Sequence, residues 1–62
     1  MTVDIKGLGK ITASKEVLNE LVSAFYNESD FYKNKNYLAR SERSNKRADI
    51  IYDALEKCGY YD

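Results

Sequence analysis

The sequence contains no histidine, no proline and no tryptophan, and it has a single cysteine, Cys58. Without histidine, no side chain has an ordinary pKa suited to general acid and base catalysis at neutral pH, and the common zinc-binding spacings cannot be assembled. One cysteine cannot form a disulfide within the chain. Cys58 lies on an apolar stripe near the end of an expected helix, which favours a buried structural thiol over a nucleophile. We therefore expect a protein that is not an enzyme.

Long apolar runs are also missing. The first ten residues, MTVDIKGLGK, include no apolar segment of signal-peptide length, and no stretch reaches the length that spans a membrane. Together with one unpaired thiol, this favours a reducing compartment. We expect a cytoplasmic protein without membrane contact.

The small size of the chain points to self-association. A domain of 62 residues buries only about 60% of the surface that its unfolded chain exposes, and such domains usually need a disulfide, a metal or a partner. Six of the eight aromatic residues are tyrosines, which suit interfaces because the ring is apolar and its tip polar. We expect a homo-oligomer whose copies meet through a surface made by Tyr52, Leu55, Tyr60 and Tyr61.

The local patterns predict a small single domain of the α+β class, in which an N-terminal β-hairpin packs on two α-helices, with a third as an option. Val3 and Ile5 alternate with polar residues, Gly7-Leu8-Gly9 interrupts the pattern, and it resumes at Ile11. This predicts a hairpin over residues 2–13. Ser14 is a good N-cap for an amphipathic helix over residues 14–27, which the turn-forming cluster at residues 27–30 then ends.

The second half of the chain allows two interpretations. Residues 28–43 are expected to form a basic connecting segment, in which Ser29 caps a short helical turn or Phe31 anchors a loop. A C-terminal helix then covers residues 44–58, with Gly59 as its natural stop. Alternatively, one continuous helix begins near Asn36. Its face keeps an unbroken 4-3 spacing, with three small residues in the middle: Tyr37, Ser41, Ser44, Ala48, Ile51, Leu55 and Cys58.

Charge is concentrated in one stretch, Lys33–Arg47. It holds six basic residues and one acidic residue, a local charge of +5, whereas the remainder has four basic and nine acidic residues and carries −5. Arginine forks bind phosphates through paired hydrogen bonds, and aromatic rings stack on bases. The expected ligand-binding residues are Tyr32, Lys33, Lys35, Tyr37, Arg40, Arg43, Lys46 and Arg47. If the stretch is helical, Arg40, Arg43 and Arg47 share one face.

Two other patterns carry less information. Gly7-Leu8-Gly9-Lys10 suggests a phosphate-binding loop, but that motif requires a glycine where Asp4 stands and a serine or threonine where Ile11 stands, so a hairpin turn is the better interpretation. Asp49, Asp53 and Glu56 share a helical face and could hold Mg²⁺ or Ca²⁺, yet a solvated acidic face is far more common. We expect no metal and no cofactor.

One arrangement of elements resembles a known family. The order of a strand, a helix and a second helix that opens with small polar residues, in KITASKEVLNELVSAFY and SNKRADIIYDALEK, is similar to the ribbon-helix-helix DNA-binding dimers. The resemblance implies DNA contact by Lys10 and Thr12, through a two-stranded ribbon shared by two chains. The chain departs from that pattern in two ways. Some sixteen residues separate the expected helices where the family has a tight turn, and Val3–Gly9 predicts a hairpin within one chain.

Three functions therefore stay open. The first is a binding protein that engages an anionic partner, a nucleic acid or a nucleotide, through residues 32–47. The second is an inhibitor or adaptor that docks on an acidic protein, and the third is a ribbon-helix-helix-like DNA-binding dimer. A basic helix face without any binding role is the plainest alternative. Small chains of this kind are common among accessory proteins of phages and mobile elements, an association that carries no mechanism.

Overall fold

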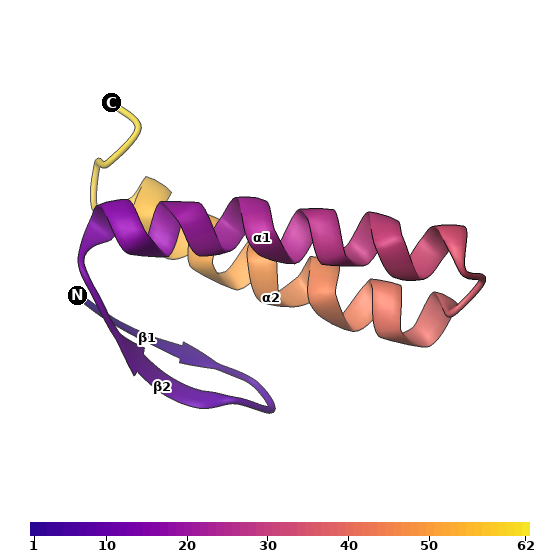
Figure 1. Cartoon of the computed structure of the whole chain (residues 1–62). Helices are drawn as coiled ribbons and strands as arrows, with labels where there is room; N and C mark the ends of the chain where they lie inside the picture. Colours follow the sequence, from indigo (N-terminus) through magenta and orange to yellow (C-terminus); the bar gives the residue numbers. More distant parts are fainter.

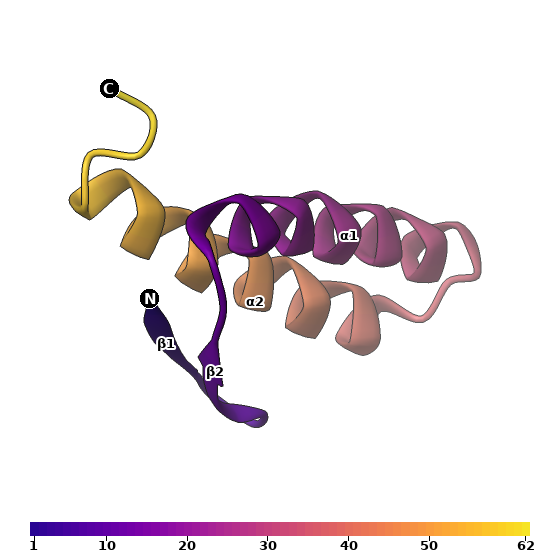
Figure 2. The same cartoon turned by 60° about the vertical axis from the view of Figure 1, so that its left-hand side comes forward.

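The structure is a computed structural model that describes all 62 residues. The elements follow in the order β1 (Thr2–Ile5), β2 (Gly9–Thr12), α1 (Lys15–Asn34) and α2 (Leu38–Lys57). The two helices lie antiparallel and side by side, and the hairpin lies against α2 on the side away from α1 (Figures 1 and 2). The expected α+β architecture, a hairpin followed by two packed helices, is confirmed.

The hairpin forms where the apolar alternation predicts it. β1 and β2 pair antiparallel from Thr2 opposite Thr12 to Ile5 opposite Gly9. Val3 and Ile5 are buried while their neighbours in β1 are exposed. A two-stranded hairpin is unstable alone in water, and here Val3 and Ile5 join residues of both helices in one core.

Helix α1 begins as predicted but runs further. The Ser14 side chain accepts a hydrogen bond from the Val17 backbone N–H at 3.2 Å, so Ser14 is the N-cap. The predicted end near Asn27 is wrong, because α1 continues to Asn34. Turn-forming residues are only weakly unfavourable inside a helix, and tertiary contacts override them. Here the contact is made by Ser29, which is buried against α2.

The predicted connecting segment over residues 28–43 is also wrong. Its first residues belong to α1 and its last residues to α2, so that only residues 35–37 join the two helices. Asn36 has a φ of 66°, in the left-handed region that asparagine tolerates better than most residues. The chain reverses there, and Tyr37 is the N-cap of α2 without a side-chain capping bond.

The longer of the two interpretations describes α2, which begins at Leu38 and ends at Lys57. A start at residue 44 is therefore wrong. The helix stops where Gly59 adopts a φ of 82° and the Tyr60 N–H donates to the Leu55 carbonyl at 3.0 Å. This is the hydrogen bond of a Schellman end, which favours glycine.

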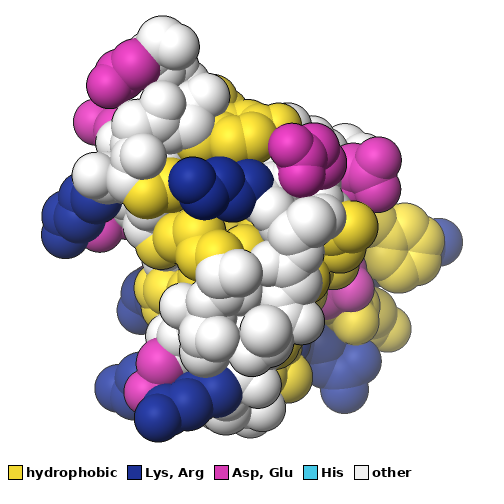
Figure 3. Space-filling model, turned by 90° about the vertical axis from the view of Figure 1, so that its left-hand side faces the viewer, with side chains coloured by type: hydrophobic (Ala, Val, Ile, Leu, Met, Phe, Trp, Pro, Cys, Tyr) yellow, Lys and Arg dark blue, Asp and Glu magenta, His cyan; other side chains and the backbone are white.

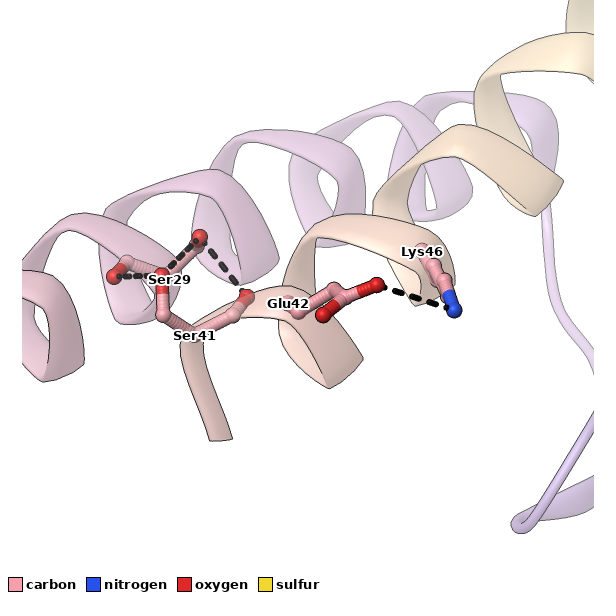
Figure 4. A network of polar contacts seen from close by, with 4 residues as sticks. All are labelled: Ser29, Ser41, Glu42 and Lys46. Atoms are coloured by element: carbon pink, nitrogen blue, oxygen red, sulfur yellow. Dashed lines mark hydrogen bonds and ion pairs between the residues drawn. The ribbon is translucent and has the colours of Figure 1, made fainter. Parts of the chain in front are cut away.

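Small residues let α2 approach α1 closely. Ser41, Ser44 and Ala48 are buried on the face that meets α1. The Ser29 and Ser41 hydroxyls each donate to the backbone carbonyl of the other residue at 2.8 Å (Figure 4). The Ser44 hydroxyl donates to Glu28 at 2.6 Å. The seam of small residues is thus occupied by α1 of the same chain.

The core is made of apolar residues from β1, α1 and α2. It consists of Val3, Ile5, Leu18, Val22, Ala48, Ile51 and Leu55. Cys58 lies outside it, and the expected buried thiol is wrong because the residue is exposed just beyond the end of α2. Neither helix is both long and apolar enough to cross a membrane.

Candidate anion-binding site

A hollow of about 440 Å³ lies between the hairpin turn and α2. The hairpin is shorter than the helices and ends near the middle of α2, so the first half of this helix extends past the turn (Figure 1). We call the hollow the basic groove. It is lined by Lys6, Gly7, Ala39, Glu42, Arg43, Lys46, Arg47 and Ile50.

The groove is strongly positive. Arg43, Lys46 and Arg47 are spaced by three and four residues, which places them on one side of α2, and Lys6 approaches from the turn. Glu42 is the one carboxylate in the lining, and its oxygen lies 3.2 Å from the Lys46 ammonium (Figure 4). Both side chains are largely exposed, so this ion pair is weak. The four cations and one anion leave a net charge of +3.

Arg47 extends from α2 to the hairpin turn. Its Nη2 lies 3.8 Å from the position that a Cβ on residue 7 would occupy. Gly7 also has a φ of 91°, which favours glycine over residues with a side chain. The Arg47 Nε is buried and has no hydrogen-bond partner in the chain. A buried donor without a partner is unusual in a folded protein, and an oxyanion in the groove is a ligand that could satisfy it.

A second cluster lies at the end of the helix pair, around residues 35–37. We call it the aromatic tip, and it consists of Phe31, Tyr32, Lys35, Tyr37 and Arg40. The Arg40 guanidinium lies 5.9 Å from the Tyr32 ring centre and 5.5 Å from that of Tyr37. The Lys35 ammonium lies 5.8 Å from the Phe31 ring centre. These are cation–π distances.

The eight expected ligand-binding residues therefore fall in three places. Arg43, Lys46 and Arg47 line the basic groove. Four others belong to the aromatic tip: Tyr32, Lys35, Tyr37 and Arg40. Lys33 borders a separate hollow of about 340 Å³ that also contains Asp30 and Glu42. The expected shared face of three arginines reduces to two in the groove, because Arg40 turns to the tyrosines.

Sequence reasoning missed the groove residues outside the basic stretch. Lys6 and Gly7 lie more than thirty positions before Arg43 in the chain, and Ala39 and Ile50 form part of the apolar lining. The lysine beside a hairpin turn was visible as a local feature. Its placement against α2 depends on how Val3 and Ile5 dock in the core, which no local pattern specifies.

The expected tyrosine interface is largely engaged within the chain. Leu55 is 0% exposed, so its assignment to an oligomer surface is wrong: it fills the chain's own core. The Tyr52 and Tyr61 rings stack with their centres 5.0 Å apart, and Tyr60 meets Tyr61 edge-on at 5.1 Å. These contacts fold the C-terminal residues back on the helices. Tyr52 and Tyr61 still expose 42% and 40% of their surface.

The acidic face of α2 is occupied by hydrogen bonds and an ion pair. The Tyr26 hydroxyl donates to Asp49 at 2.6 Å, and Lys57 lies 2.9 Å from Asp53. The bond to Asp49, with burial second, raises the pKa of Tyr26 to about 12. No three histidine, cysteine, aspartate or glutamate residues come together in a set that could hold a metal ion.

None of the protein-family models, curated proteins or solved structures compared with this chain matches it. The geometry of the basic groove and the aromatic tip therefore supplies the whole argument about function.

Proposed function

We propose that this protein is a small non-enzymatic binding protein that holds a phosphate-bearing ligand, a nucleic acid or a nucleotide, in the basic groove. The observation that carries the proposal is the convergence of Lys6 from the hairpin turn with Arg43, Lys46 and Arg47 from α2 around one hollow. Like charges brought together from separate elements repel one another, and an anion between them relieves that repulsion.

The size and chemistry of the groove favour phosphate over an acidic protein surface. A hollow of about 440 Å³ lies within the range of about 300–1,000 Å³ that is typical of small-ligand sites. A stable protein interface needs roughly 800 Å² from each partner, far more than one groove of eight residues offers. Arginine forks match phosphate oxygens in pairs, and the Arg47 Nε supplies a further donor.

A ribbon-helix-helix-like mode of DNA binding is the second candidate. The short connection at residues 35–37 removes one of the two departures from that family. The other departure stands, because β2 pairs with β1 of its own chain. Exposed Lys10 on β2 would contact DNA in this mode, so Lys10→Gln tests it separately from the groove.

The proposal is tested by fluorescence anisotropy with labelled DNA, RNA and a cyclic dinucleotide at about 50 and about 200 mM salt. We expect binding that weakens steeply with salt. Arg43→Gln and Lys6→Gln should each weaken binding and reduce the slope of log K against log salt by about 1 for a nucleic acid. Glu42→Gln should act in the opposite direction, because it removes the only carboxylate of the groove.

Lys15→Gln is the matched control. Lys15 is an exposed lysine in the first turn of α1, outside the groove, and its removal changes the net charge by the same amount. It should change affinity far less than Lys6→Gln. Equal effects of the two variants would show that binding depends on the overall charge and not on the groove. Failure of every ligand to bind at low salt would overturn the proposal. A loss with Lys10→Gln alone would favour the ribbon-like mode.

A further inference from the structure

The aromatic tip exposes two rings that take no part in the core. Phe31 is 55% exposed and Tyr37 is 53% exposed. The core contains seven buried apolar residues, and none of them is aromatic. Large rings held at the surface beside positive charge are typical of sites that stack on bases.

The positive charges at the tip are free of carboxylates. The ion pairs of the chain are Lys46 with Glu42 and Lys57 with Asp53, so neither Lys35 nor Arg40 is neutralised by an ion pair. Arg40 contacts the rings of Tyr32 and Tyr37 instead, and Tyr32 meets Tyr37 with ring centres 6.4 Å apart. These contacts hold the rings and leave positive charge beside them.

Helix α2 contributes residues to both the tip and the basic groove. Tyr37 is the N-cap of α2, and Arg43 and Arg47 follow in the same helix. A rise of 1.5 Å per residue places them roughly 9 and 15 Å further along the helix axis. A strand of several nucleotides can reach from the tip into the groove, whereas a mononucleotide occupies one of the two.

Resting on the proposed function, we infer that the ligand is a single-stranded nucleic acid. Its phosphates lie in the basic groove, and at least one base stacks on Phe31 or Tyr37. A duplex fits less well, since its bases already stack on one another and only the two terminal pairs leave a face for an aromatic ring. The groove, at about 440 Å³, is also too small to enclose a duplex. Stacking of unpaired bases above a positive groove is the usual way in which proteins bind single strands without reading their sequence.

The test uses the full chain and three labelled DNA probes of about 12 nucleotides: a single strand with bases, an abasic strand with the same phosphates, and a blunt duplex. We expect the single strand to bind at least fivefold more tightly than the abasic strand, from a stacking contribution of about 1 kcal/mol or more per base. It should also bind more tightly than the duplex.

Two ring variants locate the stacking. Phe31→Ala combined with Tyr37→Ala should bring the base-bearing strand down to the affinity of the abasic strand, without changing the abasic affinity. Tyr37→Phe keeps the ring and should leave the preference intact. Leu38→Ala is the matched control, because Leu38 is an exposed apolar residue of the same region without a ring. If the double variant loses helical circular dichroism, Phe31→Ala alone provides the readout, since Phe31 lies on the exposed side of α1.

The outcomes separate the two proposals. Equal binding of base-bearing and abasic strands, with the groove variants still weakening both, would overturn stacking and leave the groove in place. Preference for the duplex would overturn the single-stranded ligand. If none of the three probes binds at low salt, the single-stranded ligand is overturned, and the groove proposal is overturned as well if RNA and the cyclic dinucleotide also fail to bind.

Discussion

The hydrogen bond between the side chains of Tyr26 and Asp49 joins α1 to α2. The hydroxyl donates to a carboxylate oxygen at 2.6 Å, and hydrogen bonds to charged acceptors are stronger than neutral ones. Tyr26→Phe removes the donor and keeps the ring. We expect the variant to lose about 1 kcal/mol of unfolding free energy at neutral pH, measured by urea denaturation.

The pH dependence of this contribution follows from the direction of the pKa change. The pKa of Tyr26 rises from 10.0 to about 12 because the protonated hydroxyl is bonded to Asp49. The folded state therefore holds its proton more tightly than the unfolded chain does, and the stabilisation is present below pH 10 and disappears between pH 10 and about 12. The difference in unfolding free energy between wild type and Tyr26→Phe should vanish across that interval.

Tyr61 and Lys57 also have raised pKa values, so the effect of Tyr26 must be taken from the difference between wild type and Tyr26→Phe. Burial raises the pKa of Tyr61, and a hydrogen bond with Asp53 raises that of Lys57. Both groups remain in wild type and in Tyr26→Phe, so the difference isolates Tyr26. A difference that stays constant up to pH 12 would show that the bond to Asp49 does not govern this titration.

The contact between the helices depends on small side chains at its centre. Ser44 is 2% exposed and donates to Glu28. Ser44→Leu adds volume where no space exists and removes this bond, so we expect a loss of about 2–3 kcal/mol in unfolding free energy. Asn45→Leu makes a similar change at the adjacent, exposed position and should stay within about 0.5 kcal/mol of wild type. Equal urea midpoints for the two variants would contradict this account of the seam.

Local patterns predicted the hairpin, the beginning of α1 and the end of α2, but not the end of α1 or the beginning of α2. The alternation around Val3 and Ile5 and the Ser14 cap depend on neighbours in sequence, and both occur as predicted. The end of α1 could not be predicted in this way, because residues 27–30 favour a turn on their own. They are helical because Ser29 bonds with Ser41, twelve positions away.

The site was predictable in composition but not in shape. The concentration of positive charge between Lys33 and Arg47 is evident in the sequence. Its division into a groove and a tip is not, since that depends on the turn at residues 35–37 and on the position of Lys6 beside α2. Helical periodicity grouped Arg40 with Arg43 and Arg47, but it could not reveal the competing contact with two tyrosine rings.

At the scale of the whole molecule, the two ends differ in chemistry. The end formed by residues 35–37 carries the basic stretch, and the opposite end holds both chain termini (Figure 1). Figure 3 shows that opposite end, where hydrophobic side chains appear between charged ones of both signs. Ligand binding at the basic end should therefore weaken as the salt concentration rises, because salt screens charge attraction. Self-association at the opposite end should not weaken, because salt does not screen hydrophobic contact.

Self-association at the end with the termini is the prediction that belongs to this scale. Tyr52 and Tyr61 form a stacked pair that is partly exposed, and a core of seven residues is small for a stable monomer. We expect light scattering at micromolar concentration to give a mass of at least two chains, unchanged between about 50 and about 200 mM salt. Tyr52→Lys should shift the protein to the monomer, because it places a charge in the contact. Leu8→Lys makes the same change at an exposed residue of the hairpin turn and should leave the mass unaltered. A monomeric wild type would refute the association, and a monomer produced by Leu8→Lys but not by Tyr52→Lys would move the contact to the hairpin.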